Sequence, residues 1–388
     1  MKVAVLGAGA MGTGIGQIAV QNGCHVVYYD SFPGATDRSK ASIEKIFNRL
    51  AEKGKITSQQ KEEMLGRMQW SADIDAVSGA DLVVEAVIED LDVKKDLFAK
   101  VEPLLRSDAW LCTNTSSLSI AALSSGLTHP ERFGGLHFFN PAPLMPLVEV
   151  VPGVNTGDDF TETMEALMLE WGKVPVVAKD TPGFIVNKVA RPFYSEAIKL
   201  YEEGVASVAE IDAAVKSIGF RMGPFELTDL IGHDVNYTVT ETVWSQFFYD
   251  PRFRPSITQK RLKEAGLFGR KTGRGFYNYA SGMDAAVVAQ EEVEIDPLLS
   301  EKIVERILCL IINEALDAVW QGIASPENVD LAMTKGVNYP KGPIQWGREM
   351  GWDQVLGTLK RCHKHYGDDR YRPCPLLRHL NTGNAELG

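Results

Sequence analysis

The sequence predicts an α/β protein in which an N-terminal doubly wound, mostly parallel sheet is followed by two tandem all-helical domains. Short apolar runs alternate with amphipathic segments in the first half of the chain, which is typical of successive βα units. From Phe184 onward the pattern is mostly helical, and this helical part contains an internal repeat. We therefore expect domains at residues 1–180, 181–282 and 296–388.

The composition is ordinary for a soluble globular protein: of 388 residues, 45% are hydrophobic and 23% are charged. The net charge of −11 argues against a general affinity for nucleic acid or anionic membranes, so a polyanionic ligand would need local donors. We see no signal peptide and no apolar run of about 18 residues, and therefore expect no membrane span. The five scattered cysteines suggest reduced thiols in a cytoplasmic protein.

A glycine-rich turn follows the first predicted strand, Lys2–Leu6, and opens the first predicted helix. In this G-x-G-x-x-G pattern the first glycine makes the tight turn, the second lets the backbone approach a pyrophosphate, and the third allows close packing of helix and strand. The helix N-terminus adds the positive end of its dipole. The sequence therefore predicts a dinucleotide site at Gly7, Gly9, Ala10, Met11 and Gly12.

The second predicted strand, His25–Tyr29, ends at Asp30. A carboxylate at this position accepts hydrogen bonds from the ribose hydroxyls of a dinucleotide. No Arg or Lys follows directly in Ser31-Phe32-Pro33, so no cation is placed to receive a 2′-phosphate. We therefore expect NAD as the cofactor in preference to NADP.

Residues 36 to 69 are charged and helical in character, with a break at Gly54, and predict two helices. Their basic residues would either meet the phosphates of a substrate or form a solvated helix face, which is the commoner situation for any one of them. These residues are Lys40, Lys45, Arg49, Lys53 and Lys55.

Two later strands end in polar residues, at the edge where open α/β sheets bind ligands. The buried run Asp81–Val87 contains Glu85 and is followed by Glu89, with Lys94 in the next helix. The run Trp110–Thr113 ends in Asn114-Thr115-Ser116-Ser117. Those hydroxyls would either cap the next helix or hold a substrate oxygen.

The stretch from Phe133 to Gly153 holds one His and one Glu in two apolar runs that a Pro-rich turn connects. Desolvation makes an unpaired charge in such runs costly. Two strands joined in this way would bring His137 opposite Glu149, and a carboxylate there would orient the imidazole and stabilise its cationic form, as a general base requires. The alternative is a core histidine and an unrelated strand-edge glutamate; the dinucleotide motif favours the pair.

The helical part repeats at a nearly constant spacing. Glu196, Gly204, Ser207 and Asp212 recur 118 positions later as Glu314, Gly322, Ser325 and Asp330. Gly223-Pro224 and Gly232 recur 119 positions later, and Arg254-Pro255 again 118 positions later. The two copies differ, because Pro182–Asn187 and the segment Gly269–Tyr277 accompany only the first one. Residues 281 to 296, which are acidic and rich in Ala and Val, are the expected linker.

Cys362, His363, His365 and Cys374 gather near the end of the second copy. Their spacing fits no standard zinc pattern, and we therefore predict no metal site.

Together these motifs resemble one family, the NAD-dependent L-3-hydroxyacyl-CoA dehydrogenases, including the 3-hydroxybutyryl-CoA dehydrogenases. The resemblance covers residues 1 to about 280, with HFFNPAPLMPLVEVV as its most specific motif, and the repeat extends it to the end of the chain. It implies that His137 is the general base and that Glu149 orients and polarises it. It also implies that Ser116 hydrogen-bonds the 3-oxygen of the substrate and that Asn187 assists near that oxygen or the thioester carbonyl.

The same resemblance implies that Asn140 holds the nicotinamide end of NAD. It assigns three charged residues to the cofactor side, namely Glu89, Lys94 and Lys271. It places the coenzyme-A contacts of the family near residues 39 to 49, without identifying individual side chains.

The expected reaction is the reversible oxidation of a (S)-3-hydroxyacyl-CoA, with 3-hydroxybutyryl-CoA as the expected short-chain substrate. A dicarboxyl substrate such as 3-hydroxyadipyl-CoA stays open, as does a sugar-acid (gulonate-type) 3-dehydrogenase on the same fold. A non-catalytic NAD-binding protein is the alternative of another class. The intact set of Ser116, His137, Glu149 and Asn187 argues against it.

Members of this family with one helical domain usually dimerise through that domain. We expect the second copy to pack on the first as an internal pseudo-dimer partner and to be non-catalytic. The chain would then be a monomer or a homodimer.

Overall fold

The computed structural model describes residues 1–279, 293–383 and 387. The chain forms two compact units, residues 1–184 and 185–388. The predicted linker, 281 to 296, lies largely outside the described residues. Among the described residues, no helix is both long and apolar enough to cross a membrane.

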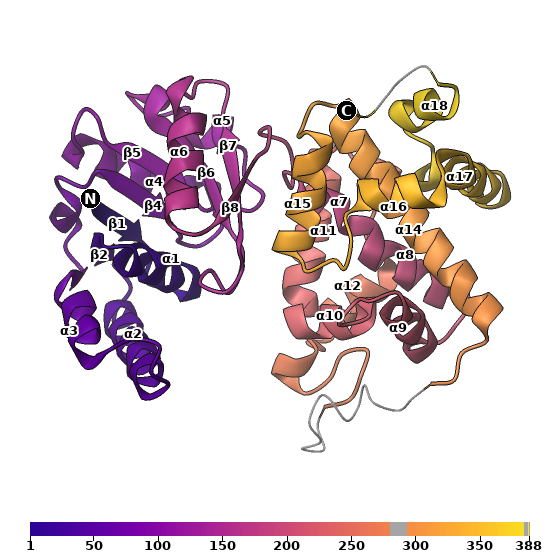
Figure 1. The fold of residues 1–388 in the computed structure, drawn as a ribbon, viewed down its shortest axis with the longest axis horizontal. Coiled ribbons are helices and arrows are strands. Elements are labelled where there is room, and N and C mark those ends of the chain that lie inside the picture. Colours follow the sequence, from indigo (N-terminus) through magenta and orange to yellow (C-terminus); the bar gives the residue numbers. More distant parts are fainter. Residues whose placement is uncertain (280–292, 384–386, 388) are drawn as a thin grey trace. The chain divides into compact units, whose positions relative to one another are not determined.

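The first unit is an eight-stranded sheet with the strand order β3-β2-β1-β4-β5-β6-β7-β8, drawn in indigo to magenta in Figure 1. All neighbouring strands are parallel except β6 and β7. The strands are β1 (Lys2–Leu6), β2 (His25–Tyr29), β3 (Met68–Ser71), β4 (Leu82–Glu85), β5 (Trp110–Thr113), β6 (Phe133–Phe138), β7 (Leu147–Pro152) and β8 (Val174–Val177). The predicted doubly wound sheet, a Rossmann-type arrangement, is confirmed.

Six α-helices accompany these strands: α1 (Ala10–Gln21), α2 (Ala35–Glu52), α3 (Ser58–Gly66), α4 (Leu91–Val101), α5 (Ile120–Ser124) and α6 (Asp159–Glu170). The helix α2 is amphipathic and buries Ile43 and Phe47 against the core. The expected pair of helices around Gly54 is present as α2 and α3. Strand β3 was not predicted: it is a short edge strand in which only Met68 is buried, so its sequence carries no apolar run.

The second unit is helical, as predicted. It begins with α7 (Val186–Val189), α8 (Arg191–Glu202), α9 (Val208–Ser217), α10 (Pro224–Ile231), α11 (His233–Gln246) and α12 (Ile257–Glu264). It continues with α14 (Pro297–Trp320), α15 (Pro326–Gly336), α16 (Pro343–Met350), α17 (Trp352–Tyr366) and α18 (Pro375–Asn381). The long helix α14 packs on α7, α8 and α9 of the first repeat (Figure 1).

The two repeats use the same local devices at matching positions. Asp212 accepts the backbone N–H groups of Phe225 and Glu226 at the start of α10, at 2.9 and 3.0 Å. Asp330 accepts the corresponding N–H groups at the start of α16, at 2.7 and 3.0 Å. In each case a carboxylate satisfies donors that the helix itself leaves without partners. The glycine before each helix, Gly223 or Gly342, is the position at which the chain passes this carboxylate closely.

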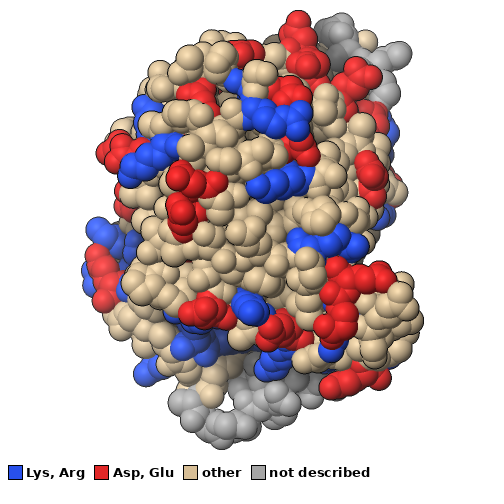
Figure 2. Space-filling model, turned by 90° about the vertical axis from the view of Figure 1, so that its left-hand side faces the viewer, with Lys and Arg blue, Asp and Glu red and all other residues tan. Residues whose placement is uncertain are grey.

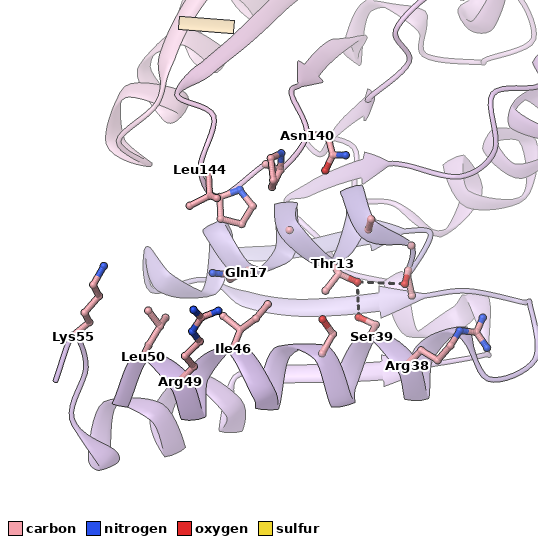
Figure 3. Close-up of a pocket in the computed structure, with 18 of the residues that line it drawn as sticks. Thr13, Gln17, Arg38, Ser39, Ile46, Arg49, Leu50, Lys55, Asn140 and Leu144 are labelled. Carbon is pink, nitrogen blue, oxygen red and sulfur yellow. Dashed lines mark hydrogen bonds between the residues drawn. The ribbon is translucent and has the colours of Figure 1, made fainter. Parts of the chain in front are cut away.

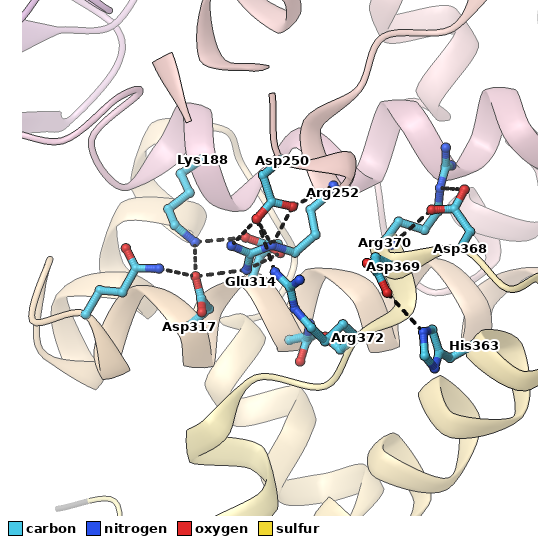
Figure 4. A network of polar contacts seen from close by, with 12 residues as sticks. Lys188, Asp250, Arg252, Glu314, Asp317, His363, Asp368, Asp369, Arg370 and Arg372 are labelled. Atoms are coloured by element: carbon cyan, nitrogen blue, oxygen red, sulfur yellow. Dashed lines mark hydrogen bonds and ion pairs between the residues drawn. The ribbon is translucent and has the colours of Figure 1, made fainter. Parts of the chain in front are cut away.

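Charged contacts between the repeats are reciprocal. Arg254 binds Asp368 at 3.1 Å, and Arg372 binds Asp250 at 3.1 Å, the two pairs being related by the repeat spacing. Figure 4 shows part of this network. Such an exchange, in which residue i meets j′ while j meets i′, defines an isologous, two-fold interface.

The same exchange continues in the buried part of the interface. Arg252 binds Glu314 at 3.2 Å, and Arg370 binds Glu196 at 3.5 Å. Lys188 binds Glu314 at 2.8 Å, and Arg306, its counterpart in the repeat, binds Glu196. The two repeats therefore face each other through equivalent surfaces.

The close approach at Gly223 leads to a stability prediction. A Cβ at this position would lie 2.3 Å from the Cγ and 2.4 Å from the Cα of Asp212. The Cα belongs to the backbone of α9 and cannot move away without shifting that helix. We expect Gly223→Ala to lower the free energy of unfolding by about 1–3 kcal/mol in chemical denaturation, as overpacking usually does. Gly66→Ala is the control, because a Cβ there meets nothing within 4 Å. Equal stability of the two variants would contradict the prediction.

Candidate active site

The glycine-rich turn lies at one end of a cavity of about 790 Å³ in the first unit. Gly7 has a φ of 102°, and a Cβ there would lie 2.6 Å from the carbonyl oxygen of Ala86. A Cβ on Gly12 would lie 1.9 Å from the carbonyl oxygen of Gly7, whereas one on Gly9 would meet no atom within 4 Å. The first and third glycines therefore serve packing, and the second leaves open space at the N-terminus of α1, where a phosphate would be bound.

Asp30 lies at the end of β2 and lines the same cavity. Its carboxylate accepts the N–H of Ala8 at 2.8 Å and that of Phe32 at 2.8 Å, which fixes it beside the turn. The remaining lone pairs can accept ribose hydroxyls. These features fit a dinucleotide. The cavity is also lined by Arg38, a cation that the sequence analysis did not place there.

His137 and Glu149 are directly opposite each other in the antiparallel pair β6 and β7. The Nδ1 atom of His137 lies 2.6 Å from Oε2 of Glu149. The side chain of Glu149 is 0% exposed and that of His137 is 7% exposed. The carboxylate thus engages Nδ1 and leaves Nε2 as the nitrogen for proton exchange with a substrate.

Two aromatic side chains flank the imidazole of His137. The ring centroid of Phe139 lies 4.4 Å away and that of Phe184 lies 5.9 Å away. Apolar walls of this kind lower the local polarity and strengthen the contact between imidazolium and carboxylate.

The polar turn after β5 is held by Glu89. One carboxylate oxygen of Glu89 accepts the Thr115 hydroxyl at 2.6 Å, the Ser116 N–H at 2.8 Å and the Ser117 N–H at 3.2 Å. Thr115 and Ser117 are buried, whereas Ser116 between them is partly exposed. Strands β4, β5 and β6 are parallel neighbours, so Glu89, Ser116 and His137 lie at the same carboxyl edge of the sheet.

Lys94 lies beneath this turn and lines neither of the two cavities described here. Its side chain is 1% exposed and binds Glu85 at 2.7 Å and Glu89 at 3.1 Å. Burial raises the pKa of Glu85. Burial would also raise the pKa of Glu89, but Lys94 and the donors of the turn bring it below its ordinary value. Any influence of Lys94 on a cofactor would therefore pass through Glu89.

A second cavity of the first unit, of about 660 Å³, lies between α1, α2 and the turn after β6 (Figure 3). Its apolar lining includes Ile46, Leu50 and Leu144. Basic side chains also line it, namely Arg38, Arg49, Lys53 and Lys55. Asn140 is among its lining residues. Lys40 and Lys45, two further basic residues of this segment, do not line this cavity.

The cations of the second cavity are a local feature. On the face of the molecule shown in Figure 2, basic and acidic side chains are interspersed over the surface. An anionic ligand of this cavity would therefore be attracted by the few cations that line it, as the net charge suggests.

Lys173 is a supporting residue that the sequence analysis missed. Its amine donates to the carbonyl oxygens of Ala142 at 2.6 Å and Met145 at 3.0 Å, and so holds the turn that carries Asn140. Burial lowers the pKa of Lys173 to about 8. The sequence shows a lysine directly before an apolar strand. It could not show what this lysine binds, because the carbonyl groups are about 30 positions away in the chain.

Two predicted site residues belong to the second unit. Asn187 is in α7, and its backbone carbonyl accepts a hydrogen bond from Arg191 at 2.9 Å. Lys271 forms an ion pair with Asp234. The segment around Lys271 wraps Asp229, which accepts the N–H groups of Phe276 and Tyr277 at 3.0 and 2.9 Å.

The Cys and His residues near the end of the chain have local roles. The Sγ atom of Cys374 accepts the N–H of Leu377 at the start of α18, and His363 contacts Asp369 at 3.2 Å. Within the described ranges, no group of three or more His, Cys, Asp or Glu side chains is arranged to hold a metal ion.

Comparison with known protein families agrees with this geometry. The family model for the NAD-binding domain of 3-hydroxyacyl-CoA dehydrogenase matches residues 2–181. The model for the C-terminal domain of the same enzymes matches two segments, 183–279 and 303–385.

Individual relatives are similar over most or all of the chain. A 3-hydroxyadipyl-CoA dehydrogenase of Escherichia coli K12 is 39% identical, over 97% of this chain and 96% of the relative. A probable 3-hydroxybutyryl-CoA dehydrogenase of Deinococcus radiodurans is 42% identical, over 72% of this chain and 100% of the relative. The crystal structure of a 3-hydroxybutyryl-CoA dehydrogenase from Escherichia coli K12 superposes with a TM-score of 0.91 at 37% identity, covering 99% of this chain and 98% of that one. The chain therefore belongs to the 3-hydroxyacyl-CoA dehydrogenase family of NAD-dependent oxidoreductases.

Proposed function

We propose that His137 is the general acid and base of a reversible (S)-3-hydroxyacyl-CoA oxidation and that Glu149 orients it. The carrying observation is the buried 2.6 Å contact between Nδ1 of His137 and Glu149. In oxidation, Nε2 of His137 takes the proton of the C3 hydroxyl, and the C3–H bond breaks as the carbonyl forms. The carboxylate of Glu149 stabilises the imidazolium that results. When bound, NAD supplies the acceptor for the hydride that leaves C3.

Ser116 and Asn187 have positioning roles in this proposal. The Ser116 hydroxyl donates to Glu89 at 3.2 Å in the structure and, in the proposal, turns to donate to the 3-oxygen of the substrate. Asn187 assists near that oxygen or at the thioester carbonyl. The support for Ser116 is its partly exposed place in a turn that Glu89 holds rigidly. On the cofactor side, we propose that Asp30 binds the ribose of NAD, that Asn140 holds the nicotinamide end, and that Glu89, Lys94 and Lys271 support that binding.

The second cavity is our proposed site for part of coenzyme A. Its apolar lining and its four basic side chains suit a ligand that combines a phosphorylated nucleotide with an apolar arm. Arg49, Lys53 and Lys55 are the phosphate partners that this cavity favours, because all three line it and lie at the end of α2 or just after it. Figure 3 shows Arg49 and Lys55 at one edge of the cavity.

We propose a short 3-hydroxyacyl-CoA, such as 3-hydroxybutyryl-CoA, as the substrate, with NAD in preference to NADP. A second candidate, 3-hydroxyadipyl-CoA, is favoured by the name of the relative that matches over 97% of the chain. The free thiols of the five cysteines support our further proposal of a cytoplasmic location.

The pair of His137 and Glu149 leads to a first kinetic prediction. We expect His137→Gln and Glu149→Gln each to lower kcat by about 100- to 10,000-fold, because proton transfer or its electrostatic support is lost. NADH binding, measured by fluorescence titration, should survive, since the dinucleotide cavity does not include either residue. Glu162→Gln, the same change on the exposed side of α6, should leave kcat unchanged. A near-normal kcat in Glu149→Gln would make this carboxylate purely structural.

The choice of substrate and cofactor is tested by steady-state reduction of several 3-oxo compounds. We expect high kcat/KM with acetoacetyl-CoA and NADH, and a lower value with NADPH because Asp30 repels a 2′-phosphate. An acetoacetyl thioester without the nucleotide of coenzyme A should show a raised KM if the second cavity binds that part.

Two further substrates complete this comparison. A higher kcat/KM for 3-oxoadipyl-CoA than for acetoacetyl-CoA would replace the short-chain assignment by the dicarboxyl one. Turnover of a free 3-hydroxy acid as fast as of its thioester would favour the sugar-acid alternative.

We further propose that the second repeat is an internal pseudo-dimer partner and that the chain is a monomer. The reciprocal ion pairs support this, because Glu314 binds Lys188 where a second copy of the first repeat would offer Glu196.

Light scattering should therefore give the monomer mass of 42.7 kDa for the full chain. A chain ending before residue 290 should form dimers, because its buried charges would need the same partners from another copy. A full-length dimer formed through the first repeat would contradict the proposal.

A further inference from the structure

The helix α7 presents Asn187 from a run that is otherwise inside the unit. From Ile185 to Tyr194, each residue is buried except Asn187, which is partly exposed. The helix has only four residues, and a single helical turn has no appreciable stability of its own. Its orientation must therefore come from the groups that hold it.

Lys188, the next residue, is clamped by the second repeat. Its side chain is 0% exposed, and its amine lies 2.8 Å from Glu314 and 2.8 Å from Asp317, both on α14 (Figure 4). Burial would raise the pKa of Asp317, but Lys188 and Arg252 bring it below its ordinary value. The clamp is therefore ionic at neutral pH, and removing either side would leave a buried charge without its partner.

The clamp on Lys188 limits the directions that Asn187 can take. Consecutive side chains on an α-helix are separated by about 100° around its axis, so a fixed position of one limits the rotation available to the next. Arg191 of the first repeat adds a second hold, since its Nε donates to the carbonyl oxygen of Asn187 at 2.9 Å. Arg191 Nη2 also donates to the side-chain Oδ1 of Asn187 at 3.5 Å. The first repeat thus contacts the backbone and the side chain of Asn187, and the second repeat fixes the neighbouring position on the helix through Lys188.

We propose that the second repeat is a positioning module for the active site: Glu314 and Asp317, acting through Lys188, hold α7 so that Asn187 has its working orientation. This inference rests on the role proposed above for Asn187. It gives the second repeat a function in turnover besides covering the first.

The repeat symmetry supplies the matched control. Arg306 is the counterpart of Lys188 and pairs with Glu196 and with Glu203, the latter at 2.8 Å. The ion pairs of Arg306 also join the two repeats. The residue before Arg306 is Glu305, the counterpart of Asn187, and it accepts the Thr358 hydroxyl at 2.7 Å. A loss of the Arg306 contact should therefore weaken the interface without releasing α7.

The test compares variants of the full-length chain by kcat, KM and melting temperature, with acetoacetyl-CoA and NADH. We expect Lys188→Met and Asp317→Asn to lower kcat by about 10- to 100-fold, the range for a slightly misplaced group, with the KM for NADH unchanged. Lys188→Arg should keep most of the activity, because an arginine makes the equivalent contact at position 306. Glu203→Gln should lower the melting temperature but leave kcat unchanged.

A double-mutant cycle separates positioning from general destabilisation. If Lys188 acts through Asn187, the Asn187→Ala and Lys188→Met changes will not be additive, and the double variant will be about as slow as Asn187→Ala alone. Additive losses, or equal losses of kcat in Asp317→Asn and Glu203→Gln, would overturn the inference. Full activity of Asn187→Ala would instead contradict the role of Asn187 in the proposed function, and this outcome differs from those that contradict the positioning role of the second repeat. Asp317→Asn keeps the test decisive if Lys188→Met does not fold.

Discussion

The buried carboxylate of Glu149 is the constraint on which the active site depends. A carboxylate with no exposure is costly to ionise unless a donor or cation meets it, and the antiparallel pairing of β6 and β7 places His137 opposite it. The same contact fixes which ring nitrogen can exchange a proton. Among neighbouring strands of the sheet, only β6 and β7 are antiparallel, and this pairing is what brings the imidazole of His137 against the carboxylate of Glu149.

Buried lysines recur beside the residues that are proposed to act on substrate or cofactor. Lys94 holds Glu89 and, through it, the turn of Ser116. Lys173 holds the turn of Asn140, and Lys188 adjoins Asn187. In each case the lysine amine has little or no exposure to water. Separating it from its partners would leave a buried charge unpaired, and this free-energy cost keeps the partners in place. The polar side chain nearby is partly exposed in Ser116 and Asn187 and exposed in Asn140, and the buried lysine holds its backbone in a defined position.

In our proposal, the duplicated repeat makes the contacts that a second subunit would otherwise make. Equivalent residues of the two repeats exchange ion pairs, as in a two-fold dimer, but the two halves are free to diverge because they belong to one chain. The pair of Lys188 and Arg306 illustrates this divergence, since one adjoins Asn187 and the other adjoins Glu305. The proposed internal partner would keep the symmetry of the interface, while only the first repeat carries Asn187 and Lys271, the two proposed site residues of this unit.

The sequence by itself determined the dinucleotide turn, the family, the pairing of His137 with Glu149, and the αβ order of the first unit apart from the edge strand β3. These depend on short spacings and on the cost of placing a charge in an apolar strand, which are both local properties. Only the tertiary structure decided which distant groups meet: Lys94 with Glu85 and Glu89, and Lys188 with α14. The contacts of Lys188 join residues up to 129 positions apart, and the pair of Arg370 and Glu196 joins residues 174 positions apart. Such contacts depend on how the elements pack, which no local pattern of the sequence encodes.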